Sequence, residues 1–284
     1  MDFNTRTPYL TVKDHSVSKE TFDLIIDKEL QLLKTNPQPS IDNLGRYYES
    51  EDYISHTDGK RTLFEKLYHT VKQKALQDKI KLVRQFAPKT GNLLDIGAGT
   101  GDFLVVAKHS GFTITGIEPS EKARAIAVKK GINLVDSLSN VPDHSQDAVT
   151  MWHVLEHVPD VEVQIKELKR VLKPDGVLVI AVPNYKSYDA QYYGPFWAAY
   201  DVPRHLWHFS KTAIQKLFWQ QQIELIKVLP MKFDSFYVSL ISEKYKSGKM
   251  NFVKGFWMGL RSNTKASRTG EYSSHIYVLK NAKM

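Results

Sequence analysis

Short apolar runs alternate with segments of helical periodicity through the middle of the chain. Five runs have the length and β-branched character of buried strands, at 93–96, 112–117, 132–137, 147–151 and 177–182. Between the last two, apolar positions recur at helical spacing after Asp160, a good N-cap, and end at the turn signal 173–176. Strands that alternate with helices in this way predict an α/β fold with a doubly wound, mostly parallel sheet.

The segments on both sides of this core are expected to add helices and two more strands. Apolar residues such as Phe22, Ile26 and Leu33 predict a helix over 14–33, and a second, longer helix is expected over 62–86. We therefore divide the chain into an N-terminal helical cap at 1–89 and a sheet domain at 90–284. Ser210 is the expected N-cap of a helix over 211–221. Strands expected at 223–229 and 275–279 complete a seven-stranded sheet.

A basic, aromatic segment lies between these last two strands. Residues 233–262 predict one or two amphipathic helices, and the region 231–270 is treated as an insertion before the last strand. Two interpretations remain open, helices that pack on the core and a lid over a hydrophobic substrate. A surface for a membrane or a lipidic substrate belongs to the second interpretation.

Glycines follow the first central strand at alternate positions. Gly97, Gly99 and Gly101, with Ala98 between the first two, permit a tight turn and a close approach of the backbone to a ligand. The turn leads into a helix N-terminus, whose free N–H groups favour an electron-rich ligand group. The third glycine comes one residue too early for a dinucleotide fingerprint. We therefore expect a nucleotide-like cofactor that is not a dinucleotide.

Acidic and polar residues end the neighbouring strands. Glu118, followed by Pro119, stands at the end of the second strand, where a carboxylate suits the vicinal hydroxyls of a ribose. Asp136 and Ser137 end the third strand, and Trp152 and His153 end the fourth. In a parallel sheet these ends meet at one edge, so all of these residues are candidates for cofactor binding.

The D-x-G-x-G-x-G stretch that begins at Asp95 resembles motif I of the class I S-adenosylmethionine-dependent methyltransferases. The later signatures E-H-V at 156–158 and L-K-P-D-G at 172–176 are similar to the ubiquinone-type, small-molecule branch of that family. The resemblance covers about 92–183. It implies a Rossmann-like methyltransferase fold, with S-adenosyl-L-methionine as cofactor and S-adenosyl-L-homocysteine as product. It further implies that Asp95 helps to hold the amino group of the cofactor and that Asp136 and Ser137 lie beside the adenine.

Histidines supply the candidate catalytic bases, because their pKa lies near neutrality. His153 is the first choice, and His205 and His208, on an aromatic loop expected at 192–210, are the others. Relatives of the ubiquinone type carry Glu at position 153 in what has been viewed as a metal cluster. Here His153, Glu156 and His157 form an alternative metal set, although we predict no resident metal.

Aromatic and polar residues outside the cofactor motifs are candidates for substrate contact. Three come from the N-terminal region and three from the segment after the fifth strand: Tyr48, Tyr53, His56, Asn184, Tyr185 and Arg204. Packing of the aromatic residues on the core is the competing interpretation.

Composition and charge limit the function classes further. The chain of 284 residues has no cysteine and a formal net charge of +8. Ten Lys or Arg and three Asp or Glu fall in 231–284. No secretory signal or spanning segment is recognisable, so we expect a cytoplasmic protein. The oligomeric state is left open.

Three functions are consistent with these patterns. The preferred one is methyl transfer to an O or N of a small, hydrophobic or aromatic molecule. A nucleic-acid methyltransferase is less favoured, because W-H-V-L at 152–155 stands where base-methylating enzymes usually carry a proline-rich tetrapeptide. A Rossmann-type cofactor-binding protein without transferase activity is the third.

Overall fold

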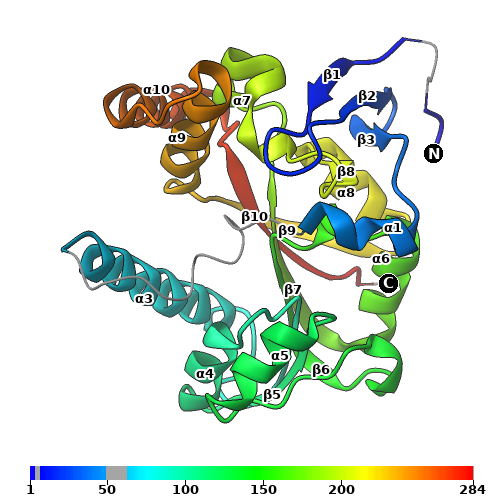
Figure 1. Cartoon of the computed structure of the whole chain (residues 1–284). Coiled ribbons are helices and arrows are strands. Elements are labelled where there is room, and N and C mark those ends of the chain that lie inside the picture. The colour runs from blue at the N-terminus through cyan, green and yellow to red at the C-terminus, as the bar shows by residue number, and fades with distance from the viewer. Residues whose placement is uncertain (4–6, 49–62, 284) are drawn as a thin grey trace.

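A six-stranded mixed sheet forms the centre of the molecule (Figure 1). The computed structural model describes residues 1–3, 7–48 and 63–283. The order across the sheet is β5-β4-β6-β7-β10-β9. These strands span Thr113–Ile117, Asn92–Ile96, Gln146–Trp152, Leu172–Pro183, Ser274–Asn281 and Ile223–Pro230, in that order. The first four are parallel, and β10 runs antiparallel to both β7 and β9.

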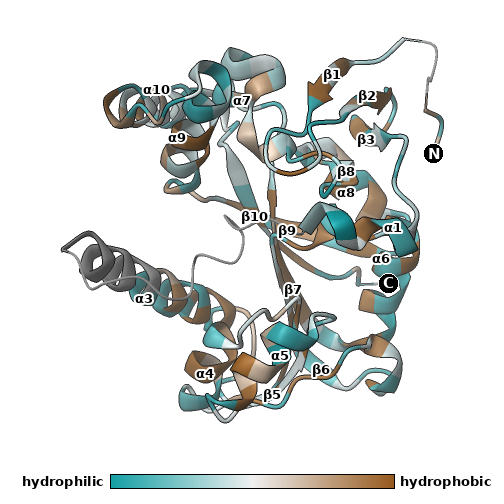
Figure 2. Cartoon of the chain, viewed as in Figure 1, coloured by the Kyte–Doolittle hydropathy of each residue, from teal (hydrophilic) through white to brown (hydrophobic). Residues whose placement is uncertain are grey.

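Helices cover both faces of this sheet, as the doubly wound prediction requires. One face packs against α6 (Val161–Val171) and α8 (Lys211–Trp219), and the other packs against α3 (Leu63–Arg84), α4 (Asp102–His109) and α5 (Glu121–Val128). Successive residues of a strand point to opposite faces, so Leu94 and Leu93 belong to different cores. Hydrophobic residues follow the central strands between these layers (Figure 2). Asp160 caps α6 and Ser210 caps α8, as expected from the sequence.

The expected third strand at 132–137 is reduced to a single bridge. Val135 pairs with Ile117 in parallel orientation, and its carbonyl accepts a hydrogen bond from the Glu118 N–H at 2.8 Å. The bridge still sets the end of this segment beside the end of β5. The sheet therefore has six strands in the described residues rather than seven.

The predicted helix over 14–33 is wrong. This region forms β1 (Leu10–Lys13), β2 (Thr21–Asp27) and β3 (Leu32–Asn36), which join β8 (Trp207–His208) in a second, antiparallel sheet of four strands. Asp14 starts a tight turn by accepting hydrogen bonds from the backbone N–H groups of Ser16, Val17 and Ser18. Of the proposed helical cap at 1–89, the long helix α3, the short α1 (Ile41–Leu44) and the 3₁₀ turn Gly45–Tyr48 are helical in the described residues.

The 231–270 insertion folds as a helical hairpin. Its helices are α9 (Asp234–Ser247) and α10 (Phe252–Thr269), which pack on each other and on α7 (Tyr188–Tyr193). A third hydrophobic core joins this hairpin and α7 to the N-terminal sheet. Among the described helices, none is long and apolar enough to cross a membrane.

Candidate functional site

The glycine loop leaves β4 with an open space above its middle residue. Gly97, Gly99 and Gly101 all have positive φ, at 70°, 53° and 77°. A Cβ on Gly97 would lie 2.3 Å from Val154, whereas a Cβ on Gly99 would meet no atom within 4 Å. The first glycine is therefore required by packing against the segment after β6. The second leaves room for a ligand at the carboxyl edge of the sheet.

Glu118 fastens this loop to the neighbouring strand. Its Oε2 accepts a hydrogen bond from the Gly99 N–H at 2.8 Å, and its Oε1 accepts one from the Ser120 N–H at 2.9 Å. The carboxylate therefore lies beside the open space above Gly99. Pro119 and Asp136 are exposed near this edge, and Ser137 caps the 3₁₀ turn Leu138–Asn140.

Asp95 lies beneath the loop and is buried. Its Oδ1 accepts a hydrogen bond from the Thr150 hydroxyl at 2.5 Å. Burial raises the pKa of Asp95 to about 7, against the opposing effects of Thr150 and of the Lys79 ammonium. Lys79, from α3, has a pKa lowered by burial, and its Nζ lies 4.4 Å from the centre of the Trp152 ring. An aromatic ring, a lysine and a buried carboxyl group thus border the cofactor loop.

His153 is held between two carboxylates. Its Nδ1 lies 3.3 Å from Glu156 Oε1, and its Nε2 lies 3.1 Å from Oδ2 of Asp234, at the start of α9. Burial alone would lower the pKa of His153, but the close carboxylates of Asp234 and Glu156 outweigh it and raise the pKa to about 10. A histidine that keeps its proton at neutral pH cannot accept one, so this geometry disfavours His153 as the base.

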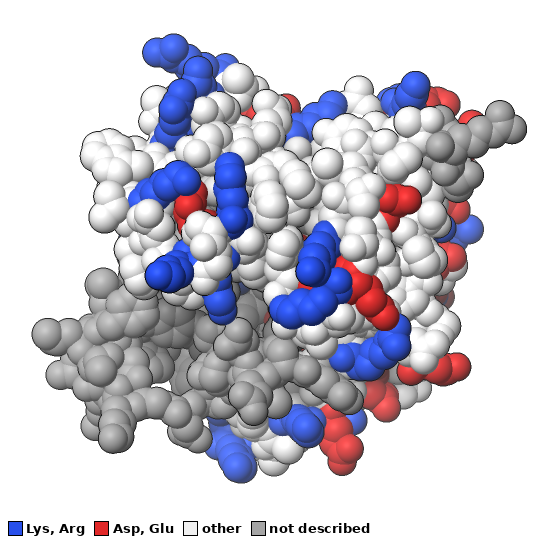
Figure 3. All heavy atoms as spheres, turned by 45° about the horizontal axis from the view of Figure 1, so that its top comes forward, with Lys and Arg blue, Asp and Glu red and all other residues white. Residues whose placement is uncertain are grey.

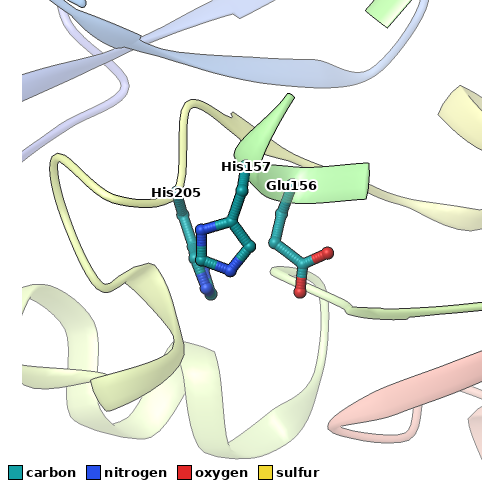
Figure 4. A group of neighbouring side chains, drawn as sticks. All are labelled: Glu156, His157 and His205. Carbon is teal, nitrogen blue, oxygen red and sulfur yellow. The ribbon is translucent and has the colours of Figure 1, made fainter. Parts of the chain in front are cut away.

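A second group of side chains includes Glu156 and two further histidines. Figure 4 shows Glu156 and His157, which follow β6, beside His205 from the aromatic loop, and each offers a ligand atom within 4.8 Å of the others. His157 Nδ1 lies 3.0 Å from the Arg204 carbonyl, and His205 Nδ1 lies 2.9 Å from the Ala199 carbonyl. A carbonyl only accepts, so both Nδ1 atoms carry a proton, and Nε2 is the ring nitrogen of each histidine that remains to accept one or to ligate a cation.

The Glu156 carboxylate is buried, and hydrogen bonds do not fully compensate the loss of its hydration. The Glu156 side chain is 1% exposed, and neither of its oxygens makes a hydrogen bond of good geometry to any described residue. Burial lowers the pKa of His205 to about 4, with the neighbouring His157 adding to the effect, so His205 is neutral. Two imidazoles beside an incompletely paired carboxylate form a group that can accept a proton, or can ligate a divalent cation.

His208 and three of the substrate candidates are occupied by structural contacts. Burial lowers the pKa of His208 well below its usual value, and its Nε2 lies 3.0 Å from the Thr35 hydroxyl. Asn184 donates to Glu271 and to the Tyr272 carbonyl, and the Tyr185 hydroxyl donates to the Gln31 carbonyl. Arg204 is 3% exposed and pairs with Asp14 and Asp201. The geometry favours a bracing role for all four.

Of the three substrate candidates in the N-terminal region, the structure describes one. The Tyr48 hydroxyl lies 3.0 Å from His157 Nδ1, so Tyr48 borders the histidine group. Tyr53 and His56 lie outside the described residues.

Sequence reasoning missed Asp234 and Lys79. Neither has a local motif. Asp234 lies at the start of a surface helix, 81 positions after His153, and Lys79 is one of many lysines on α3. Only the folded chain brings them to this edge.

Comparison with known proteins agrees with this geometry. A family model described as a methyltransferase domain matches residues 68–228, which is more than half of the chain. The ubiquinone biosynthesis O-methyltransferase of Actinobacillus pleuropneumoniae is 32% identical over 135 residues, 42% of this chain and 58% of that protein. The 2-methyl-6-phytyl-1,4-hydroquinone methyltransferase of Synechocystis is 35% identical over 140 residues, 43% of each chain. This chain thus spans about half the length of these relatives.

Solved structures share the fold. The geranyl diphosphate C-methyltransferase from Streptomyces coelicolor superposes with a TM-score of 0.54 at 13% identity, over 80% of this chain and 88% of that one. A sarcosine dimethylglycine methyltransferase structure from Galdieria sulphuraria gives 0.51 at 15% identity, over 75% of this chain and 86% of that one.

The fold and the glycine loop define a Rossmann-like, cofactor-binding α/β protein. The chain belongs to the methyltransferase domain family, within the class I S-adenosylmethionine-dependent group and near its ubiquinone-type branch. Its cofactor is S-adenosylmethionine.

Proposed function

We propose that this chain transfers the methyl group of S-adenosylmethionine to an oxygen or nitrogen of a small, hydrophobic or aromatic molecule. The curated relatives are named for ubiquinone biosynthesis and for a phytyl hydroquinone, which supports a hydroxylated ring with an apolar substituent. In this proposal the cofactor lies above Gly99, with its ribose at Glu118 and its amino group near Asp95.

One structural observation supports methyl transfer in addition to cofactor binding. Glu156 and His157, in the segment that follows β6, lie beside His205 of the aromatic loop, and Val154 of the same segment packs on Gly97 of the cofactor loop. An acceptor held there donates its O–H or N–H proton to the Nε2 atom of His157 or His205. Its lone pair then forms the new bond to the methyl carbon, while the carbon–sulfur bond breaks and its electron pair stays on sulfur. The products are the methylated acceptor, S-adenosylhomocysteine and a protonated histidine.

A turnover assay with isotopically labelled S-adenosylmethionine tests this assignment. The acceptor panel consists of phenols and hydroquinones with alkyl chains of increasing length, with amines and transfer RNA as the competing classes. We expect label in an apolar phenol or hydroquinone. Label in RNA alone would replace the proposal by the nucleic-acid alternative, and no label in any acceptor, with cofactor binding intact, would favour a binding protein without transferase activity.

Variants of the two histidines test the chemical step separately. His157→Gln and His205→Gln together should lower kcat by about 10²–10⁴-fold, the usual contribution of a general base. The affinity for S-adenosylhomocysteine should stay unchanged. His109→Gln, at the exposed end of α4, is the matched control. Full activity in the double variant would remove these histidines from the mechanism.

The same three side chains are also a suitable donor set for a divalent cation such as Zn²⁺. A bound cation would lower the pKa of an acceptor hydroxyl. We propose direct proton transfer, in keeping with the prediction of no resident metal, so activity should survive treatment with EDTA. Loss of activity that Zn²⁺, Mn²⁺ or Mg²⁺ restores, together with metal bound in the wild type and absent from Glu156→Gln, would assign a cation to this group instead.

We also keep the hairpin at 231–270 as a lid over the acceptor. The contact of Asp234 with His153 supports this placement, because it joins the first turn of α9 to the end of β6. Replacing 233–262 by a short linker should raise KM for an apolar acceptor. Unchanged cofactor binding and turnover would exclude the lid.

A further inference from the structure

Helix α10 carries a stripe of large apolar side chains on its outer surface. Phe252, Val253, Phe256 and Trp257 are exposed to 61%, 70%, 55% and 62%. Leu260 continues the same stripe. Monomeric proteins rarely expose contiguous apolar patches of more than a few hundred Å² unless the patch binds something. The described surface of this helix is therefore a candidate docking surface.

The packing of α10 explains why the large residues point outward. A Cβ on Gly255 would lie 2.9 Å from Leu240 Cα, and one on Gly259 would lie 2.8 Å from Phe236 Cα. These two glycines, four positions apart, let the backbones of α9 and α10 approach closely. Small residues thus fill the contact with α9, where a water-soluble amphipathic helix usually places its large ones.

The charges of the hairpin are complementary to an anionic surface. Residues 231–270 contain eight Lys or Arg and two acids. Asp234 pairs with His153, and Glu243 is buried, where it accepts from the Tyr193 hydroxyl and pairs with Lys254. Both acids are thus engaged within the protein. Figure 3 shows Lys and Arg side chains at upper left, over the region of this hairpin, beside uncharged surface.

The cations of α10 lie next to the apolar stripe. Arg261, Lys265 and Arg268 follow it along the helix and are exposed, and Lys254 lies within it in sequence. At 100° per residue, these four side chains fall on one flank of the stripe, between it and the contact with α9. Apolar rings beside a row of cations are typical of helices that lie in the interface of a membrane.

We propose that the outer face of α10, the docking face defined by Phe252, Val253, Phe256, Trp257 and Leu260, binds the surface of an anionic lipid bilayer. The apolar side chains enter the boundary between headgroups and acyl chains, and the flanking cations contact lipid phosphates. This binding does not require the proposed methyl transfer. If that function also holds, the docking face brings the site at His153 next to a membrane that contains apolar acceptors, because α9 packs on α10 and its Asp234 contacts His153.

Vesicle co-sedimentation of the full chain tests the proposal. We expect binding to vesicles of phosphatidylcholine with phosphatidylglycerol, weaker binding at high salt, and little binding to phosphatidylcholine alone. The double variant Phe256→Ser with Trp257→Ser should lose at least tenfold in affinity. Trp219→Ser is the matched control, because Trp219 is 60% exposed on α8, away from the hairpin.

A charge variant separates the electrostatic contribution to membrane binding from the apolar one. Arg261→Gln, Lys265→Gln and Arg268→Gln together should weaken binding to anionic vesicles and reduce its salt dependence. The matched control replaces three exposed lysines elsewhere, Lys122, Lys129 and Lys166, by Gln and should bind like the wild type. Equal losses in both triple variants would mean that net charge, and not this face, is responsible.

Two further results would overturn the proposal. One is no binding to vesicles of any composition tested. The other is a concentration-dependent dimer, measured by light scattering, that the Phe256→Ser, Trp257→Ser variant converts to monomer without any effect of lipid. That second result would assign the docking face to a second copy of the chain. Turnover of a water-soluble acceptor in the absence of vesicles tests the proposed methyl transfer independently of membrane binding.

Discussion

Glu118 is the residue on which cofactor binding should depend most. It braces Gly99 and Ser120 through both carboxylate oxygens and lies beside the open space of the loop. We predict that Glu118→Ala weakens binding of S-adenosylhomocysteine by about 2–3 kcal/mol, because a charged hydrogen-bond acceptor is lost from the ribose and from the loop. Isothermal titration calorimetry measures the change directly.

The neighbouring Glu121 supplies the control for that variant. It lies in the first turn of α5 and is exposed. Glu121→Ala removes the same charge and should bind the cofactor like the wild type. Equal affinities for wild type and Glu118→Ala would contradict the assignment of Glu118 to the ribose.

Asp95 should make cofactor binding depend on pH. Burial raises the pKa of Asp95 to about 7 in the free protein. A cationic amino group near it favours the ionised form, so binding releases a proton, and affinity should fall as the pH drops below about 7, by at most about tenfold per unit. Calorimetric titrations in buffers of different ionisation enthalpy measure the number of protons that binding releases. Asp95→Asn should flatten the profile, and an unchanged profile in that variant would exclude Asp95 as the linked group.

Single residues also show how far the sequence predicts the site. The glycine loop is a contiguous motif, and Glu118 ends the next strand of the same strand–helix–strand unit, so their arrangement follows from the local sequence. His153 has the right position on the sheet, but its protonation depends on Asp234, which a local pattern cannot place. The approach of His205 to His157 likewise needs the folded loop. The cofactor side is thus predictable from sequence, and the acceptor side is not.

The secondary-structure elements of the N-terminal region were predicted incorrectly for a physical reason. Phe22, Ile25, Ile26 and Leu33 satisfy helical spacing, yet β2 buries residues on both of its faces, so strict alternation is hidden. Gln31 adopts a positive φ of 54° between β2 and β3, and Asp14 organises the turn before β2. Turn geometry, rather than periodicity, decides this segment.

The buried Asp14–Arg204 pair ties this sheet to the aromatic loop. Arg204 Nη2 lies 3.0 Å from Asp14 Oδ1, with side chains that are 3% and 0% exposed. We predict that Asp14→Asn lowers the free energy of unfolding by about 3 kcal/mol, because the buried Arg204 charge loses one of its two acidic partners. Urea unfolding measures this change.

The same pair makes the free energy of unfolding depend on pH. Burial alone would raise the pKa of Asp14, but the hydrogen bonds and charge of Arg204 and the turn amides hold it well below its usual value. Its contribution is therefore complete above about pH 4 and is lost as the pH falls further. Asp23→Asn, on the partly exposed side of β2, should change the stability little. A similar loss in both variants would argue against a special role for the buried pair.

At the scale of the whole molecule, the doubly wound sheet followed from the alternation of strands and helices. The third expected strand, at 132–137, forms only one bridge, through Val135. The N-terminal sheet, α7 and the hairpin share a core, so segments from both ends of the chain pack together on one side of the molecule (Figure 1). This arrangement depends on contacts between distant segments, which periodicity does not encode.

Calorimetric titration of the full chain with S-adenosylhomocysteine, and separately with NAD, tests the central claim most directly. The geometry of the glycine loop predicts that S-adenosylhomocysteine binds with one molecule per chain and that NAD gives no binding heat. NAD binding in the absence of S-adenosylhomocysteine binding would contradict it.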